Sequence, residues 1–204
     1  MKLTSTVQLL CLLSLGLLSS CLTSRDARIE SSYSYRGRFR HYRTYGFLSG
    51  DGLAADSTRL SESLRDAIKQ RLRLQGYKYA RRNPDLMVSY KLFEGDMRFP
   101  GFVQEDITRW VKNNDAETEE TPEEQRHPYQ PTRMLMLDGT LMVTLIDTKT
   151  DNAIWNGYAS GVTVPEGPMG EIVLKRSVRS ILDRYRVFTE EFANGNVSAS
   201  DAER

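Results

Sequence analysis

The sequence predicts an α+β fold, a two-layer sandwich in which two helices cover one face of a mixed sheet of about four to five strands. Three observations predict it. Short segments with apolar residues at every second position are typical of strands, and two longer segments repeat apolar residues at helical spacing. These segments run strand, strand, helix, strand, strand, strand, helix, with a long polar insertion after the third strand. Because two helices cannot cover both faces of such a sheet, we expect them together on one face.

The first half of the domain is expected to hold two strands, a helix and a third strand. Alternation predicts the first strand over 29–35, and aromatic residues predict the second over 42–48. The helix begins at 56–58, where all the residues are good N-caps, and ends at Gly76. The third strand, 86–93, has one strongly apolar face. Since the connection between the second and third strands has the length of a right-handed crossover, they are expected to be parallel.

The second half is expected to hold a hairpin and a final helix. Strands over 134–147 and 153–162 flank the polar segment 148–152, whose composition is typical of a turn. The last helix begins near Pro168. One side of it is predicted to carry the apolar residues Ile172, Val178, Ile181, Leu182 and Tyr185.

The N-terminal residues are typical of an export signal. Lys2 precedes an apolar run, 7–18, which is too short to span a bilayer, since that needs about 20 apolar residues. The run ends in Leu18-Ser19-Ser20-Cys21, which resembles the bacterial lipobox. In such signals the peptidase cuts before the cysteine, whose thiol and new amine are acylated, so Cys21 would carry lipid. An ordinary cleaved signal with an incidental cysteine is the alternative, although no A-x-A-like cleavage site is present.

Export would divide the chain into a signal, a tether, a domain and a tail. The expected parts are the signal peptide 1–20, the tether 21–28, the α+β domain 29–188 with its insertion 95–133, and the disordered tail 189–204. Cys11 would leave with the signal peptide, so the mature chain would keep Cys21 as its single cysteine.

The lipobox also predicts a location. Leu22, rather than aspartate, follows the cysteine, and in the enterobacterial sorting signals that this segment resembles, such a residue directs the protein to the outer membrane. Several acyl chains on one residue hold a protein on a membrane permanently. We therefore expect a lipid anchor in the outer membrane, with the domain on the periplasmic face. The inner membrane is the less favoured alternative.

A set of segments carries a family resemblance. They are 42–47, 74–77, 83–90, 139–147, 153–157 and the last helix. In this order and spacing they resemble the bacterial lipoproteins of domain-of-unknown-function family 4136, over about 29–188. The resemblance implies an α+β domain on an envelope anchor and no established activity, so no catalytic residue is carried over. Where members often have a Gly- and Tyr-rich loop, this chain has an acidic, Pro-containing insertion.

The sequence offers no motif of an active site. It contains no G-x-S-x-G elbow, P-loop, H-E-x-x-H or C-x-x-C pattern. His41 and His127 lie in polar segments without an evident partner, so both are interpreted as solvated surface residues. Asp138, Asp147 and Asp151 surround the predicted hairpin, where aspartate is ordinary turn chemistry, although paired carboxylates also serve acid–base or calcium chemistry. We expect no catalytic residue, no bound metal and no cofactor.

The aromatic residues of the predicted strands are interpreted as core. Trp155 lies in the second strand of the hairpin, and Tyr45 and Tyr90 lie in earlier strands. Stacking on a ligand is the alternative function for such rings, but filling the space between sheet and helices is their commoner role.

Charge is unevenly distributed, although the formal net charge of +1 argues against a nucleic-acid binder. Arg65, Lys69 and Arg73 lie on a strongly basic face of the first helix, and 36–43 is a second basic cluster near the expected anchor. Residues 115–124 form an acidic run. The favoured interpretation is a solvated helix face and a flexible acidic loop. The alternatives are that the basic clusters contact anionic lipid headgroups, or that the acidic loop contacts the basic helix or a basic partner.

The insertion contains an apolar pattern of its own. Ile107, Trp110 and Val111 repeat at helical spacing, and Phe102 precedes them. This pattern predicts a short amphipathic helix that packs on its own domain, with a partner or a membrane surface as alternatives. Phe102, Ile107 and Trp110 are therefore candidate contact residues. We expect deletion of 99–132 to leave the fold intact.

Together these patterns predict a membrane-anchored periplasmic lipoprotein with a non-enzymatic domain. Its expected role is to bind an envelope protein partner or a ligand, or to support the envelope. An accessory subunit of an envelope transport or export complex is the alternative. A hydrolase is disfavoured because no motif supports it.

Overall fold

The computed structural model describes residues 27–48, 58–113 and 130–187. The signal peptide, Cys21, nearly all of the tether, the acidic run 115–124 and the tail 189–204 lie outside these residues, so those predictions stay predictions. No helix within the described ranges is long and apolar enough to cross a bilayer.

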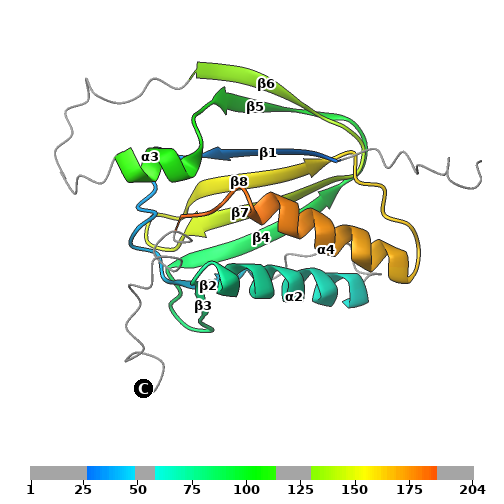
Figure 1. The fold of residues 1–204 in the computed structure, drawn as a ribbon, viewed down its shortest axis with the longest axis horizontal. Coiled ribbons are helices and arrows are strands. Elements are labelled where there is room, and N and C mark those ends of the chain that lie inside the picture. The colour runs from blue at the N-terminus through cyan, green and yellow to red at the C-terminus, as the bar shows by residue number, and fades with distance from the viewer. Residues whose placement is uncertain (1–26, 49–57, 114–129, 188–204) are drawn as a thin grey trace, which may run out of the picture.

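A mixed sheet of six strands forms one layer, in the order β1-β8-β7-β4-β2-β3 (Figure 1). β2 lies parallel to β4, as the crossover predicts, and parallel to β3, while the other neighbours are antiparallel. The α+β sandwich is therefore confirmed, with more strands than expected. The strands are β1 (Arg28–Tyr33), β2 (Thr44–Phe47), β3 (Lys78–Tyr79), β4 (Leu86–Phe93), β7 (Thr140–Asp147) and β8 (Asn152–Ser160).

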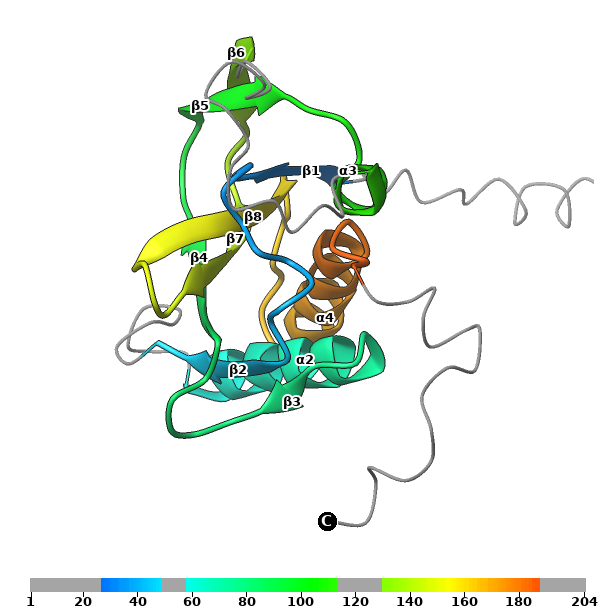
Figure 2. The same ribbon diagram turned by 90° about the vertical axis from the view of Figure 1, so that its left-hand side faces the viewer.

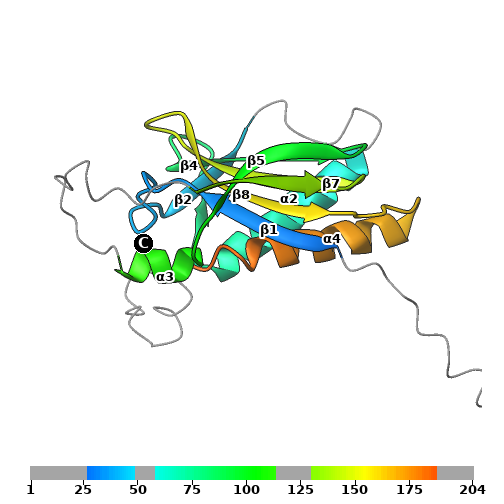
Figure 3. The same ribbon diagram turned by 90° about the horizontal axis from the view of Figure 1, so that it is seen from above.

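Two helices, α2 (Thr58–Leu74) and α4 (Pro168–Leu182), pack against one another and cover the same face of this sheet (Figures 1 and 3). The buried stripe of α2 is Leu64, Ile68 and Leu72, each one turn apart. α2 ends at Leu74, and Gly76 follows it with a φ of 92°, the left-handed conformation that closes a helix.

The core between the layers is rich in aromatic rings. The Trp155 indole is fully buried, and its ring centroid lies 5.1 Å from that of Tyr185. Gly157 leaves room for this ring, because a Cβ there would overlap both the indole and Ile181. Tyr45 and Tyr90 are also buried. The interpretation of Trp155, Tyr45 and Tyr90 as core residues is confirmed.

The insertion is folded where the structure describes it. β5 (Met97–Val103) and β6 (Gln130–Met136) pair as an antiparallel two-stranded sheet that continues from β4 and β7, and α3 (Ile107–Asn113) follows β5. Ile107 and Val111 of α3 are buried in the hydrophobic core. The predicted packing of this helix on its own domain is confirmed. The expectation that 99–132 can be deleted without damage to the fold does not fit this burial.

Two further predictions are corrected. The strand expected over 134–147 is two strands, because Gly139 adopts a φ of 73° and the chain turns there between β6 and β7. In α4, Ile172 faces away from the buried stripe and is 49% exposed. Tyr185 lies beyond the helix end, yet it is fully buried because the turns after α4 direct it into the core.

Candidate functional site

A pocket of about 380 Å³ lies at one end of the six-stranded sheet. It is formed by the loop between β1 and β2, the residue that precedes β4, and the turn between β7 and β8, which the topology brings to the same end (Figure 2). Its size falls within the range of small-molecule sites. The lining residues are Arg36, Arg38, His41, Tyr42, Asp85, Asp147, Lys149 and Thr150.

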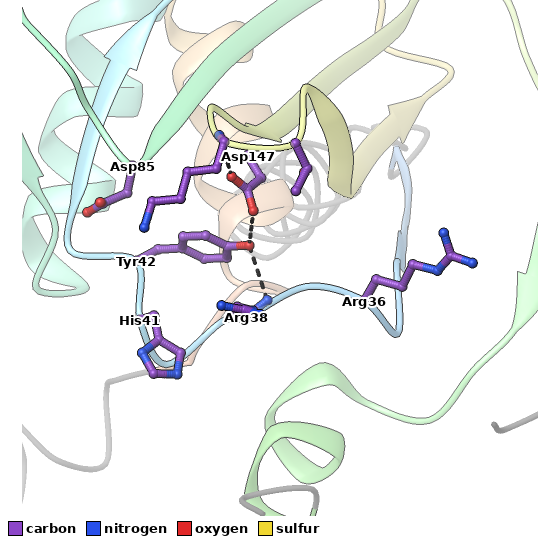
Figure 4. A pocket seen from close by; sticks show the side chains of 8 residues that line it. Arg36, Arg38, His41, Tyr42, Asp85 and Asp147 are labelled. Carbon is purple, nitrogen blue, oxygen red and sulfur yellow. Dashed lines mark hydrogen bonds between the residues drawn. The ribbon is translucent and has the colours of Figure 1, made fainter. Parts of the chain in front are cut away.

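A buried hydrogen-bond chain forms the floor of the pocket (Figure 4). The Tyr42 hydroxyl donates to Asp147 Oδ2 over 2.8 Å and accepts a bond from the Arg38 backbone amide over 3.1 Å. Asp147 Oδ1 accepts the Lys149 amide at 2.8 Å. Burial, together with the bond to the Asp147 carboxylate, raises the pKa of the Tyr42 hydroxyl far above its usual value of 10.0. Tyr42 therefore stays protonated and donating at neutral pH.

A second carboxylate, Asp85, ties β2 to β4. Its Oδ2 accepts the amides of Arg43 and Thr44, both at 2.9 Å, and the Thr44 hydroxyl at 2.8 Å. Burial alone would raise the pKa of Asp85, but these bonds and the Lys149 charge outweigh it and hold the pKa below 3.8. Asp85 is thus ionised at neutral pH and is part of the strand junction.

The rim of the pocket is basic and the floor is acidic. Arg36, Arg38, His41 and Lys149 are exposed, whereas Asp147 is buried. In Figure 4 the side chains of Arg36 and His41 extend away from Asp147. Guanidinium and ammonium groups donate several hydrogen bonds and accept none. The rim therefore suits a polar ligand whose oxygen atoms accept hydrogen bonds.

The perturbed groups around the pocket are not tuned for proton transfer at neutral pH. A general base works best when its pKa is close to the operating pH. The pKa of Tyr42 is raised and that of Asp85 is lowered, so both shifts lead away from neutrality. Within the described ranges, no three His, Cys, Asp or Glu side chains lie close enough to hold a metal ion. These shifts hold the two side chains in one protonation state each around the pocket.

The predicted basic face of α2 lies over the exposed edge of the sheet. The Arg65 guanidinium is 4.6 Å from the ring centroid of Phe47, and Lys69 Nζ is 5.9 Å from that of Tyr79. Lys69 also pairs with Asp66 at 3.2 Å. Arg73 is exposed. Arg65 and Lys69 are therefore partly engaged with their own domain.

The candidate contact residues of the insertion lie elsewhere. Phe102, on β5, is 38% exposed, whereas Ile107 is buried. Trp110 is half-buried, with its ring centroid 5.5 Å from that of Tyr33. Figures 1 and 2 show α3 well apart from α2, so the structure does not join the basic and aromatic candidates into one site.

No pattern in the sequence predicts this pocket. His41 was interpreted as a solvated surface residue and Asp147 as turn chemistry, yet both line the pocket. Tyr42 and Asp147 are 105 residues apart in sequence, so no local spacing links them. The signal in the sequence is Asp147 itself, the single charged residue of its strand.

The family model described as "Domain of unknown function (DUF4136)" matches residues 29–185. The chain belongs to this family. Membership agrees with the resemblance inferred from the sequence segments, and it assigns no activity to the DUF4136 domain. No curated protein matches the sequence.

Three solved structures are similar to this chain to different degrees. The chain is 12% identical to a DUF4136 family protein from Bacteroides thetaiotaomicron, with a TM-score of 0.53, over 80% of this chain and 98% of that one. It is 13% identical to a PDZ domain protein from Parabacteroides distasonis, with a TM-score of 0.48, over 78% and 35% of the two chains. It is 11% identical to PelC of Paraburkholderia phytofirmans, described as a dodecamer, with a TM-score of 0.43, over 78% and 97%. The first of these shows that the two proteins share the fold.

Proposed function

We propose that this DUF4136 protein is a lipid-anchored envelope protein whose domain binds a ligand or partner without catalysing a reaction. The observation that carries the anchor is the segment Leu18-Ser19-Ser20-Cys21, which stands a few residues ahead of the first strand at Arg28. A lipobox in this position would leave Cys21 as the first residue of the mature chain. Leu22 supports the outer membrane, with the domain on its periplasmic face.

Binding, rather than catalysis, is supported by the hydrogen bonds at the pocket. Both oxygen atoms of Asp147 accept bonds from the protein itself, one from Tyr42 and one from the Lys149 amide. Asp85 accepts bonds from two backbone amides and one hydroxyl. Carboxylates engaged in this way shape the pocket and hold the loop, and they are poor candidates for proton transfer.

The anchor is tested by replacing the cysteine. Cys21→Ser should abolish labelling with radioactive palmitate and move the protein from the membrane fraction to the soluble fraction, because serine accepts no acyl chain in this pathway. Cys11→Ser is the matched control. It changes the other cysteine of the chain, which lies within the signal peptide, and it should leave labelling unchanged. Palmitate labelling that persists in Cys21→Ser would refute the lipid anchor.

A further inference from the structure

One end of the domain, here called the anchor end, is the end at which the chain enters the first strand. β1 begins at Arg28, which pairs with Ser160 at the end of β8, and finishes at Tyr33, which pairs with Trp155. The pocket residues Arg36 and Arg38 follow Tyr33. Figure 1 shows that β1 runs the length of the sheet, so the pocket residues and the anchor end lie at opposite ends of it.

The tether limits how far the anchor end can be from the acylated residue. Cys21 and Ala27, the first residue that the structure describes, are separated by few residues. At a maximum of about 3.6 Å per residue, this segment reaches roughly 20 Å, so Ala27 cannot be farther than that from a lipidated Cys21. This step rests on the lipid anchor proposed above. The part of the domain beside Ala27 must then lie close to the membrane.

Three exposed apolar side chains lie on segments that reach this same end. Leu137, in the turn between β6 and β7, is 46% exposed, and its amide donates to the Ser160 hydroxyl over 2.6 Å. Met169 and Ile172, on the first turns of α4, are 58% and 49% exposed. The buried stripe of α4 begins at Gly170 and continues through Leu174, so Ile172 faces away from the core. The loop 161–167 joins the end of β8 to α4, and the first turns of α4 lie at the anchor end (Figures 1 and 3).

We propose that the anchor end rests on the phospholipid surface, with Leu137, Met169 and Ile172 inserted at the boundary between headgroups and acyl chains. Apolar side chains gain by leaving water, and interfacial segments bury such residues about 5–10 Å into this boundary. The acyl anchor alone would let the domain tumble at the end of its tether. The apolar side chains would fix its orientation, with the pocket on the far side, open to the periplasm.

The charges around the anchor end favour a zwitterionic surface. Arg28 and Arg98 are exposed there, and so are Glu94, Asp96 and Asp138. Two hydrogen bonds join the loop between β4 and β5 to the turn between β6 and β7. The Asp138 side chain accepts the Gly95 amide at 2.5 Å, and the Asp96 side chain accepts the Asp138 amide at 2.9 Å. Mixed charges complement headgroups that carry both signs, so the contact should depend on apolar insertion and change little with salt.

The test places a fluorescent probe at each end of the lipidated protein. Ile172→Cys marks the anchor end, and Lys149→Cys marks the pocket end, while the acylated Cys21 thiol does not react with the label. Each protein is reconstituted in phosphatidylcholine vesicles that contain lipids with a spin label on the acyl chain. We expect the probe at 172 to be quenched and blue-shifted at low and high salt, and the probe at 149 to be unaffected.

A second set of variants tests the insertion itself. In the Ile172→Cys protein, Leu137→Ser and Met169→Ser should reduce the quenching. Leu74→Ser is the matched control, because Leu74 is 63% exposed but lies at the last residue of α2, away from the anchor end. Vesicle-bound protein with no quenching at 172, or with quenching that salt abolishes, would overturn this proposal and leave the lipid anchor standing. Protein that fails to float with the vesicles would overturn both.

Discussion

Single residues hold the pocket floor together, and Asp147 is the central one. It is buried, it ends β7, and it reaches across to a loop that is distant in sequence. A buried carboxylate is costly unless donors satisfy it, and here the donors are the Tyr42 hydroxyl and the Lys149 amide. The shape of the pocket therefore depends on a few hydrogen bonds.

The first prediction concerns the Tyr42 hydroxyl. Tyr42→Phe removes one donor from Asp147 and the acceptor of the Arg38 amide, while the ring stays in place. Since a hydrogen bond to a charged group contributes about 1.5–3 kcal/mol, we expect the free energy of unfolding to fall by that amount. Tyr79→Phe is the control, because Tyr79 is 50% exposed and should change stability by no more than about 0.5 kcal/mol. Urea denaturation measures both, and equal effects would contradict the role of Tyr42.

The second prediction is a pH dependence carried by Asp85. Its pKa in the folded protein lies below the unfolded value of 3.8, so the folded state binds the proton less tightly than the unfolded state. The stabilisation is therefore complete at pH values above the unfolded pKa, and it is lost as pH falls through the folded pKa. Asp85→Asn should be less stable than the parent protein at neutral pH, and the difference should shrink in acid.

Urea denaturation at a series of pH values measures this difference. Glu62→Gln, which changes an exposed carboxylate on α2, is the control and should follow the parent protein throughout. A difference between Asp85→Asn and the parent that stays constant down to the most acidic conditions would show that the ionised carboxylate does not stabilise the β2–β4 junction.

At the scale of elements, strands whose apolar residues alternate without a break could be predicted from the sequence, and strands with an interrupted pattern could not. The third strand was predicted with the bounds that β4 has, because its alternation is unbroken. β5 was missed, since Pro100 and Gly101 stand in its middle and both disfavour strands. β3 is too short, at two residues, to show any period. The pocket could not be predicted either, because it joins a loop, a strand start and a turn that only the sheet topology brings together.

The third prediction follows from the burial of α3. Ile107 is only 2% exposed and belongs to the main core, so Ile107→Ala should lower the free energy of unfolding by about 2–5 kcal/mol. Val103→Ala, four residues earlier on β5, is the control, since Val103 is 61% exposed and should cost no more than about 0.5 kcal/mol. Thermal or urea unfolding measures both. If the two variants proved equally stable, the insertion would be dispensable for the fold, which is what the expected tolerance to deletion of 99–132 requires.

At the scale of the whole molecule, the sheet separates two ends with different chemistry. The arginines of 36–43 are near the expected anchor in sequence, and contact with anionic lipid headgroups is an alternative to a solvated surface for this cluster. β1 runs along the edge of the sheet between them and Ala27, so the structure places them at the far end, where Arg36 and Arg38 line the pocket. With the lipid anchor proposed above, this cluster would face away from the membrane that holds Cys21.

The last prediction tests where the folded unit ends. Tyr185 follows α4, is fully buried, and its hydroxyl lies 2.8 Å from that of Tyr77, which is also buried. A soluble chain of 22–187 should unfold with the same free energy as 22–204, because all the described strands and helices lie within it. A chain of 22–184 lacks this ring and should lose about 3–5 kcal/mol, the usual cost of removing a buried aromatic side chain.

Urea denaturation of the three chains separates these outcomes. Equal stability of 22–187 and 22–184 would show that Tyr185 is dispensable, whereas a large loss already in 22–187 would show that the last residues of the chain stabilise the domain.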